Sequence, residues 1–195
     1  MAANNKANVS TTRGVKGGYF LSAPADTPAD KQPTKATAFT WTPDATVWEN
    51  QGYVVEDGIT ESLSSDGAED LRDINLDVVD TTDASHTETM QVGFMEMAKN
   101  ALATQYGHAN VTDASGTIEV KHAWSDASEE RMFVFLLLLK NGRKWVKFIP
   151  SGKVTELGDL TLNATTVAQR QATITYLTDE DGVGCYDWIE SNETT

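Results

Sequence analysis

The chain has 195 residues, one cysteine and a formal net charge of −14, with 29 acidic and 15 basic side chains. A single cysteine excludes an intramolecular disulfide and a cysteine-based metal cluster. No apolar run approaches the roughly 18 residues of a membrane span, and so negative a chain argues against tight nucleic-acid binding because phosphates repel it. We therefore expect a soluble protein without membrane insertion, made in a reducing cytoplasm.

The beginning of the chain differs in composition from the rest. No apolar periodicity appears before Tyr19, and the segment 23–37 (APADTPADKQPTKAT) contains three prolines. Such polar, proline-rich sequence is typical of extended segments. We predict an N-terminal arm over 1–18 and an extended loop over 23–37, together residues 1–37, followed by one domain over 38–195. The arm has three basic residues and no acidic one: Lys6, Arg13 and Lys16.

The negative charge is concentrated in one part of the chain. Between Glu49 and Glu88 there are twelve acidic residues and one basic residue, Arg72. The segment 52–62 (GYVVEDGITES) is expected to form a turn with no lysine or arginine beside its carboxylates. These carboxylates are Glu56, Asp57 and Glu61. The block is either a solvated face or a surface that has to stay negative.

Alternation of apolar and polar residues predicts half-buried strands over 73–79, 87–92, 117–124 and 171–177. In the first of these, successive side chains point to opposite faces. One face holds Asp73, Asn75 and Asp77, and the other holds Ile74, Leu76 and Val78. In the other three strands the inward residues are Met90, Val92, Ile118, Val120, His122, Trp124, Ala172, Ile174 and Tyr176.

The run MFVFLLLL (132–139) is apolar at every position. Its length, its Phe and Val content and the KNGRK turn that follows favour a strand over a buried helix. A strand that is apolar on both faces needs a cover for its second face, either a helix or another subunit. This run is the first indication of assembly.

One helix is expected, over 93–106. Phe94, Ala98 and Leu102 recur at helical spacing, and Gly107 is a typical helix stop. The residues expected to face outward are Glu96, Lys99 and Gln105. The fold class is therefore mainly β: a β-sandwich or barrel with one packed α-helix, an extended N-terminal arm and an extended loop.

No motif has the spacing that a catalytic or metal site requires. The segment 149–155 (IPSGKVT) lacks the first glycine of a phosphate loop, and 178–182 (TDEDG) lacks the third acid of a calcium loop, so both are interpreted as hairpin turns. His122 is interpreted as a core residue and Cys185 as a small apolar one. Paired carboxylates could serve a glycosidase, yet many pairs qualify equally. We expect no enzyme, no metal and no cofactor.

Five segments occur in a familiar order. They are WENQGYVVEDGITES (48–62), RDI (72–74), ATQYG (103–107), NVT (110–112) and IPSGKVTELGDLTL (149–162). In this order the chain resembles the major tail tube protein of long-tailed, siphovirus-type bacteriophages, notably those that infect actinobacteria. The resemblance extends from about Trp48 to Tyr176 and departs from the family pattern at NLDVVDTTDASH (75–86).

The resemblance implies a β-sandwich subunit with a flanking helix. Six copies would form a ring, and rings would stack into the virion tail tube, assembled in the host cytoplasm. The implied partners are other copies of the chain, a tape measure protein, and tail terminator and tip proteins. Genome DNA would pass without specific binding. A negative lumen favours such passage, because it repels phosphates over the roughly 10 Å screening length of 0.1 M salt.

On this interpretation the acidic residues form a lumen or subunit surface. The expected lumen-facing residues are Asp73, Asn75 and Asp77. The expected inter-subunit residues are Lys6, Arg13, Lys16, Glu56, Asp57 and Glu61. The loop 23–37 is expected to lie along a neighbouring subunit. Two alternatives remain open: another virion β-sandwich, such as a head–tail joining or receptor-binding module, and a small acid-dependent glycosidase.

Overall fold

The computed structural model describes residues 9–67, 69–82, 85–123, 129–160 and 162–191. Within these residues the chain is mainly β, as predicted, with one α-helix, α1 (Lys99–Tyr106). The strands are β1 (Thr12–Gly14), β2 (Phe20–Pro24), β3 (Glu49–Asn50), β4 (Val54–Asp66), β5 (Asp70–Arg72), β6 (Val78–Thr81), β7 (Ser85–Phe94), β8 (Val111–Ala114), β9 (Thr117–Val120), β10 (Glu130–Leu139), β11 (Lys144–Leu157), β12 (Arg170–Leu177) and β13 (Tyr186–Ile189). Two short 3-10 turns, Ala29–Lys31 and His108–Asn110, complete the set.

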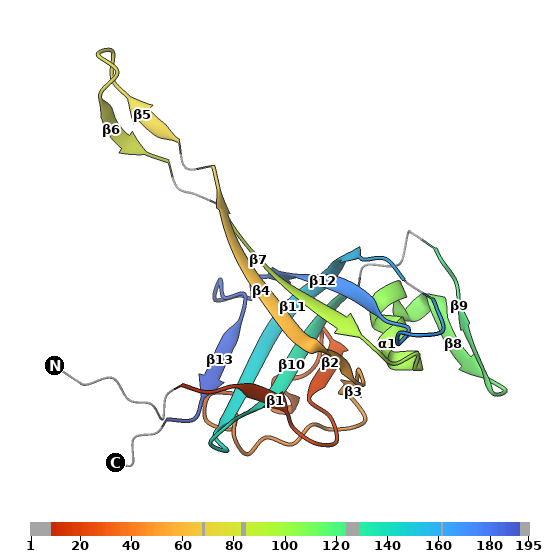
Figure 1. Ribbon diagram of the computed structural model, residues 1–195. Coiled ribbons are helices and arrows are strands. Elements are labelled where there is room, and N and C mark those ends of the chain that lie inside the picture. Colours follow the sequence, from red (N-terminus) through yellow and green to blue (C-terminus); the bar gives the residue numbers. More distant parts are fainter. Residues whose placement is uncertain (1–8, 68, 83–84, 124–128, 161, 192–195) are drawn as a thin grey trace.

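Nine of these strands form one antiparallel sheet (Figure 1). Its order is β3-β2-β10-β11-β12-β7-β4, with β1 beside β2 along β10 and β13 beside β12 along β11. The hairpin β10–β11 is the centre of the sheet and turns at Gly142, whose φ of 85° suits glycine. This confirms the strand predicted over 132–139 and the turn that follows it.

The inner face of the curled sheet packs around an aromatic core. Strands β2, β10, β11, β12, β7 and β4 all contribute to one apolar cluster, to which α1 adds Ala101. At its centre the Phe20 ring lies 4.3 Å from the Phe135 ring and 5.5 Å from the Phe94 ring, measured between centroids. The predicted inward residues Met90, Val92, Ala172, Ile174 and Tyr176 all belong to this cluster.

The second face of β10 is covered by the chain itself. Met132 and Val134 pack there against Trp48 and Ala38, which precede β3. The Trp48 indole N–H also donates a hydrogen bond to the Lys31 carbonyl, 2.9 Å away. The cover was expected to be a helix or another subunit; instead it is the β2–β3 connection of the same chain.

The N-terminal part of the chain is more regular than its composition indicated. Thr12–Gly14 and Phe20–Pro24 are strands of the large sheet, so the segments expected as an arm and a loop both contribute strands. Ala23, Thr27 and Pro33 are buried. The extended-loop expectation therefore fails at these positions, because the segment packs on the sheet of its own chain.

Beyond the curled body, β4 and β7 continue as a two-stranded ribbon that ends in the hairpin β5–β6 (Figure 1). We call the paired segments 62–66 and 85–89 the ribbon, and the residues 70–81 the tip. Every residue of β5 and β6 is exposed. The strand predicted over 73–79 is wrong, because residues 73–77 form the tight turn between β5 and β6.

Two further predicted elements are shorter than expected. The helix begins at Lys99 rather than at residue 93, because β7 continues through Phe94, which pairs with Arg170 of β12. Gly107, with φ 89°, ends the helix as predicted. Ala98, expected inward, is exposed, whereas Gln105, expected outward, is buried and donates a hydrogen bond to the Ala101 carbonyl.

The segment predicted as a strand over 117–124 is β9, which ends at Val120 and pairs only with β8 in a separate hairpin. Helix α1 lies against this hairpin and Val111 of β8 is buried, but Ile118 stays 38% exposed. His122 is exposed and contacts the Tyr106 ring at a tilt of 40°, with the centroids 4.7 Å apart, so its interpretation as a core residue is wrong. Trp124 lies outside the described residues.

The two expected hairpin turns also differ. Residues 149–155 lie within the long strand β11, with Ile149 fully buried, because β10 and β12 pair with it on either side. Residues 178–182 do form a turn, closed by a hydrogen bond from the Asp179 N–H to the Val183 carbonyl. That turn links β12 to β13 along the same edge of β11, so it is not a hairpin.

The ring stack around Phe20 gives a direct test of the curled core. Phe20→Ala should lower the free energy of unfolding by about 3–5 kcal/mol, since the cavity would lie among the rings of Phe94, Phe133 and Phe135 on β7 and β10. Urea unfolding of the free subunit measures this. Ile118→Ala, on the exposed β9, is the matched control and should change stability by less than about 0.5 kcal/mol. Equal effects of the two substitutions would contradict the position of Phe20 at the centre of this core.

Candidate assembly site

The tip leaves its apolar side chains uncovered. The exposed fractions are 98% for Ile74, 73% for Leu76, 66% for Val79, 50% for Val78 and 47% for Leu71. A two-stranded hairpin has no second layer in which to bury such residues. Apolar patches rimmed by polar residues mark interaction sites. The tip therefore has the composition of a surface that another molecule covers.

The three residues expected to face a lumen are in the turn of this tip. The Asp73 carboxylate accepts hydrogen bonds from the Asn75 N–H at 2.8 Å and the Asp77 N–H at 3.0 Å. These backbone bonds hold the pKa of Asp73 below its usual value. Leu76 completes the turn with a φ of 68°. The alternation that placed Asp73, Asn75 and Asp77 on one strand face is absent, and the lumen assignment loses that support.

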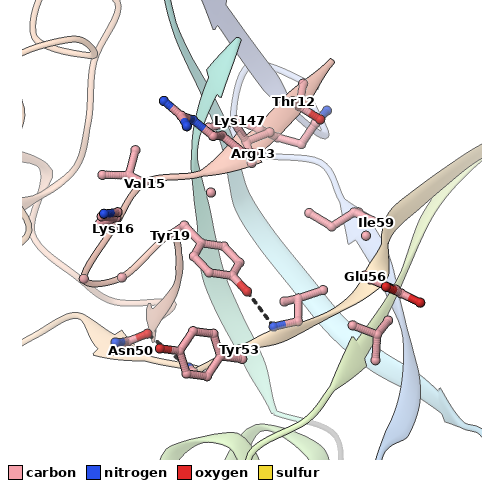
Figure 2. Close-up of a pocket in the computed structure, with 18 of the residues that line it drawn as sticks. Thr12, Arg13, Val15, Lys16, Tyr19, Asn50, Tyr53, Glu56, Ile59 and Lys147 are labelled. Atoms are coloured by element: carbon pink, nitrogen blue, oxygen red, sulfur yellow. Dashed lines mark hydrogen bonds between the residues drawn. The ribbon is translucent and has the colours of Figure 1, made fainter. Parts of the chain in front are cut away.

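A pocket of about 810 Å³ lies between the N-terminal strand and the start of β4 (Figure 2). Residues 12–19 form one wall and residues 52–59 the other, with Leu137, Trp145 and Lys147 behind them. The walls meet at one side, where the Val54 N–H donates a hydrogen bond of 2.6 Å to the Tyr19 hydroxyl oxygen. The pocket is thus the gap between two edges of the curled sheet.

The wall formed by β4 is a wide bulge. Val54 pairs with Phe94 and Ile59 with Val92, so the intervening part of β4 leaves the ladder. Gly58, with φ 76°, permits the bend. This segment was expected to be a turn, and the structure corrects it to a bulge within a strand. Its two carboxylates, Glu56 and Asp57, are exposed.

The third carboxylate of this segment, Glu61, has a buried partner. The ammonium group of Lys147, whose side chain is 7% exposed, donates to both Glu61 oxygens at 2.8 and 3.0 Å and to Asp187 at 2.8 Å. The Tyr176 hydroxyl donates to Glu61 as well, at 2.6 Å. Burial alone lowers the pKa of Lys147, but the bonds to Asp187 and Glu61 outweigh burial and raise it. The cluster attaches β4 to β11, β12 and β13 where the ribbon begins.

A second buried cation, Arg131, connects the strands at the other end of the sheet. Arg131 of β10 donates to Glu49 of β3 at 2.7 Å and to the Ser22 hydroxyl of β2. Glu49 and Glu129 also contact the two ring nitrogens of His108, at 2.8 and 2.7 Å. Burial raises the pKa of Glu49, but the bond from His108 and the charge of Arg131 outweigh burial and lower it.

The residues expected at contacts between subunits lie in three kinds of position. Arg13, Lys16 and Glu56 line the pocket, with Arg13 and Lys16 exposed. Glu61 lines it too but is paired with Lys147, and Asp57 is exposed on the bulge. Lys6 lies outside the described residues.

Within the described residues no group of three or more His, Cys, Asp or Glu side chains could hold a metal ion. No helix there is long and apolar enough to span a membrane. Cys185 is half-buried beside Lys147, and burial raises the pKa of its thiol to about 12.

The model of the phage tail tube protein family matches residues 1–195. The chain belongs to this family. A tail tube protein is a structural component of the virion tail and not an enzyme. Among solved structures, the chain is similar to the cryo-EM structure of the anti-feeding prophage cap (AFP tube terminating cap), with a TM-score of 0.41 and 11% identity over 94% of this chain and 96% of that chain. No curated protein matches the chain.

Sequence reasoning missed both buried cations of this tail tube protein. Each is a basic residue beside or between apolar residues of a strand, Arg131 before MFVF and Lys147 in WVKFI. A long basic side chain at such a position is stable only with acidic partners, because an unpaired buried charge is costly. The acidic residues without a basic neighbour in sequence, Glu49 and Glu61, are those partners.

Arg131 should be essential for folding of the subunit. Arg131→Met leaves Glu49 and Glu129 facing each other without their buried cation, which should cost about 3 kcal/mol of unfolding free energy. Lys153→Met is the matched control, because the Lys153 side chain is 39% exposed and its carboxylate partner, Glu130, is 3.8 Å away. Chemical denaturation of the free subunits compares the two. A loss for Lys153→Met as large as for Arg131→Met would contradict this role.

The lowered pKa of Glu49 predicts acid sensitivity. A carboxyl whose pKa is lower in the folded than in the unfolded state stabilises the fold above its unfolded pKa, and this contribution is lost as pH falls through the folded pKa. Melting temperatures measured from pH 7 to pH 3 should therefore fall below about pH 4.5. Glu49→Gln should melt lower at pH 7 and show a smaller fall. An unchanged pH profile in Glu49→Gln would disprove the assignment.

Proposed function

We propose that this chain polymerises as stacked rings of six subunits into the tail tube of a siphovirus-type phage, with the resemblance to actinobacteriophage proteins indicating the kind of host. The tube is the conduit through which the genome leaves the virion. The observation that carries the proposal is the exposed tip at the end of the ribbon. Its apolar side chains are uncovered in the single subunit, and only an assembly would bury them. The family to which the chain belongs indicates that this assembly is a tail tube.

The physical argument starts from the exposed apolar residues. Burying a side chain the size of Ile74, Leu76 or Val79 gains about 1.5–3 kcal/mol, and all three are more than 60% exposed in the isolated subunit. The ribbon carries them away from the body (Figure 1), so the partner surface is on another molecule. A contact between the tip and a different surface of the next copy is heterologous, and heterologous contacts produce rings or filaments. A tube needs both.

Charge suits a conduit for DNA. Each subunit carries a formal net charge of −14, so a tube of such subunits repels the phosphates of double-stranded DNA. Repulsion from the walls leaves the polymer free to slide. We propose that DNA passes without specific binding, and that assembly in the host cytoplasm involves a tape measure protein and tail terminator and tip proteins.

Removing the tip should abolish the tube without unfolding the subunit. Asp66 and Ser85 are paired across the ribbon, so replacing residues 67–84 by Asn-Gly closes the ribbon with a two-residue hairpin turn. We expect this variant to melt within a few degrees of the wild type and to stay monomeric. Negative-stain electron microscopy of the wild type should show long hollow filaments of uniform width.

Filaments of the tip-deleted variant, equal in length and number to those of the wild type, would show that the tip is not needed for the tube. A wild type that stays monomeric at every concentration would contradict the proposed function itself. Ile118→Asp is the matched control, because it adds a charge to an exposed apolar position on a different hairpin. It should assemble as the wild type does.

A further inference from the structure

We propose that the pocket between β1 and β4 receives the tip of a second copy of this chain, with the acidic residues of the tip facing Arg13 and Lys16. This inference rests on the proposed function and deepens it, because it assigns the surface on which the tip docks.

The pocket has free strand edges on both sides. Within the described residues β1 pairs only with β10, and β4 pairs only with β7. The bulge after Val54 takes β4 away from β7 as well. Unpaired strand edges are templates for an added strand. A hairpin such as β5–β6, whose outer edges are also free, is the element that fits between them.

Apolar side chains line part of the pocket, beside the charged residues Arg13, Lys16, Glu56, Glu61, Glu96 and Lys147. Its lining includes Val15, Tyr19, Tyr53, Ile59, Leu137 and Trp145. At Gly17 and Gly58, which lie on opposite walls, a side-chain carbon would meet no atom within 4 Å. The apolar side chains that the tip exposes therefore have a complementary surface to enter, and the entrance is clear of side chains.

Charge favours an acidic occupant at the β1 wall of the pocket, because the acidic lining residues Glu56 and Glu96 lie on or beside the opposite wall, residues 52–59. Arg13 and Lys16 are exposed at the pocket (Figure 2) and have no ion pair within the described residues. The tip carries exposed acidic residues, of which Asp77 and Asp80 form no ion pair in the same part of the chain. The tip's one basic side chain, Arg72, is already paired with Asp70 at 2.5 Å. The β1 wall of the pocket and the tip thus carry opposite charges that form no ion pair within the described residues.

Distance requires that the tip come from another copy. Glu61 lines the pocket, and the chain runs twelve residues from there to Asp73 in the turn of the tip. At about 3.3 Å per residue of strand this is roughly 40 Å. The ribbon leads away from the body (Figure 1), so a tip that enters the pocket belongs to another copy.

A charge-reversal series tests the pairing. Arg13→Glu with Lys16→Glu should raise the subunit concentration needed for tube formation by about tenfold or more, because like charges would then meet. Asp77→Lys with Asp80→Lys should do the same. The quadruple variant, which restores opposite charges, should assemble near the wild-type concentration. Lys140→Glu with Lys153→Glu, two cations outside the pocket lining, is the matched control and should not change assembly.

Cysteine cross-linking gives a second readout. In a Cys185→Ala background, a Val15→Cys subunit mixed with an Ile74→Cys subunit should form a disulfide-linked dimer on oxidation, whereas an Ile118→Cys partner should not. Absence of this cross-link in tubes that form normally, or wild-type assembly by the Arg13/Lys16 reversal, would overturn the pocket assignment while leaving the tail tube function intact. A wild type that never polymerises would overturn both.

Discussion

A two-stranded ribbon cannot bury its own side chains, and this constraint shapes the rest of the molecule. Isolated hairpins are at best marginally stable in water, so a ribbon with an apolar tip needs a rigid support at its base and a partner at its end. The curled nine-stranded sheet supplies the support. The partner is absent from a single subunit, which is why both strands of the tip are exposed in it.

The base of the ribbon is held by charge as well as by packing. Lys147 joins Glu61 of β4 to Asp187 of β13 across the sheet, and Tyr176 adds a hydrogen bond from β12. A buried ion pair contributes more to a defined geometry than to stability. In this protein it fixes the point at which β4 leaves the body. At the opposite end, Arg131 performs the same task for β2, β3 and the segment after α1.

Sequence pattern predicted the strands whose apolar residues face the core. Burial alternates along β12, and the apolar strand β10 is buried or half-buried over 131–139, whereas β7 buries the predicted Met90 and Val92 and also the adjacent Gly93 and Phe94. The segment 73–79 alternates equally well, yet it contains a turn in which the Asp73 side chain caps two backbone N–H groups. Local hydrogen bonds of Asp compete with strand pairing, and periodicity alone does not reveal which one prevails.

The assembly site was accessible to sequence reasoning only in part. Arg13, Lys16 and Glu56 were predicted as contact residues, and all three line the pocket, although their contact with another subunit stays a prediction. The pocket itself could not be foreseen, because it depends on a bulge in β4 and on the approach of Tyr19 to Val54, two residues 35 positions apart. Pairings over such distances in the chain have no local pattern.

Hydrogen–deuterium exchange of the tip tests the central claim most directly. The backbone N–H groups of residues 70–81 should exchange rapidly in the free subunit, since both strands of the tip are exposed. In assembled tubes they should be strongly protected, as should residues 12–15 of the pocket wall, while the core strand β10 should be protected in both states. Equal, rapid exchange of the tip in subunit and tube would contradict the claim that assembly covers it.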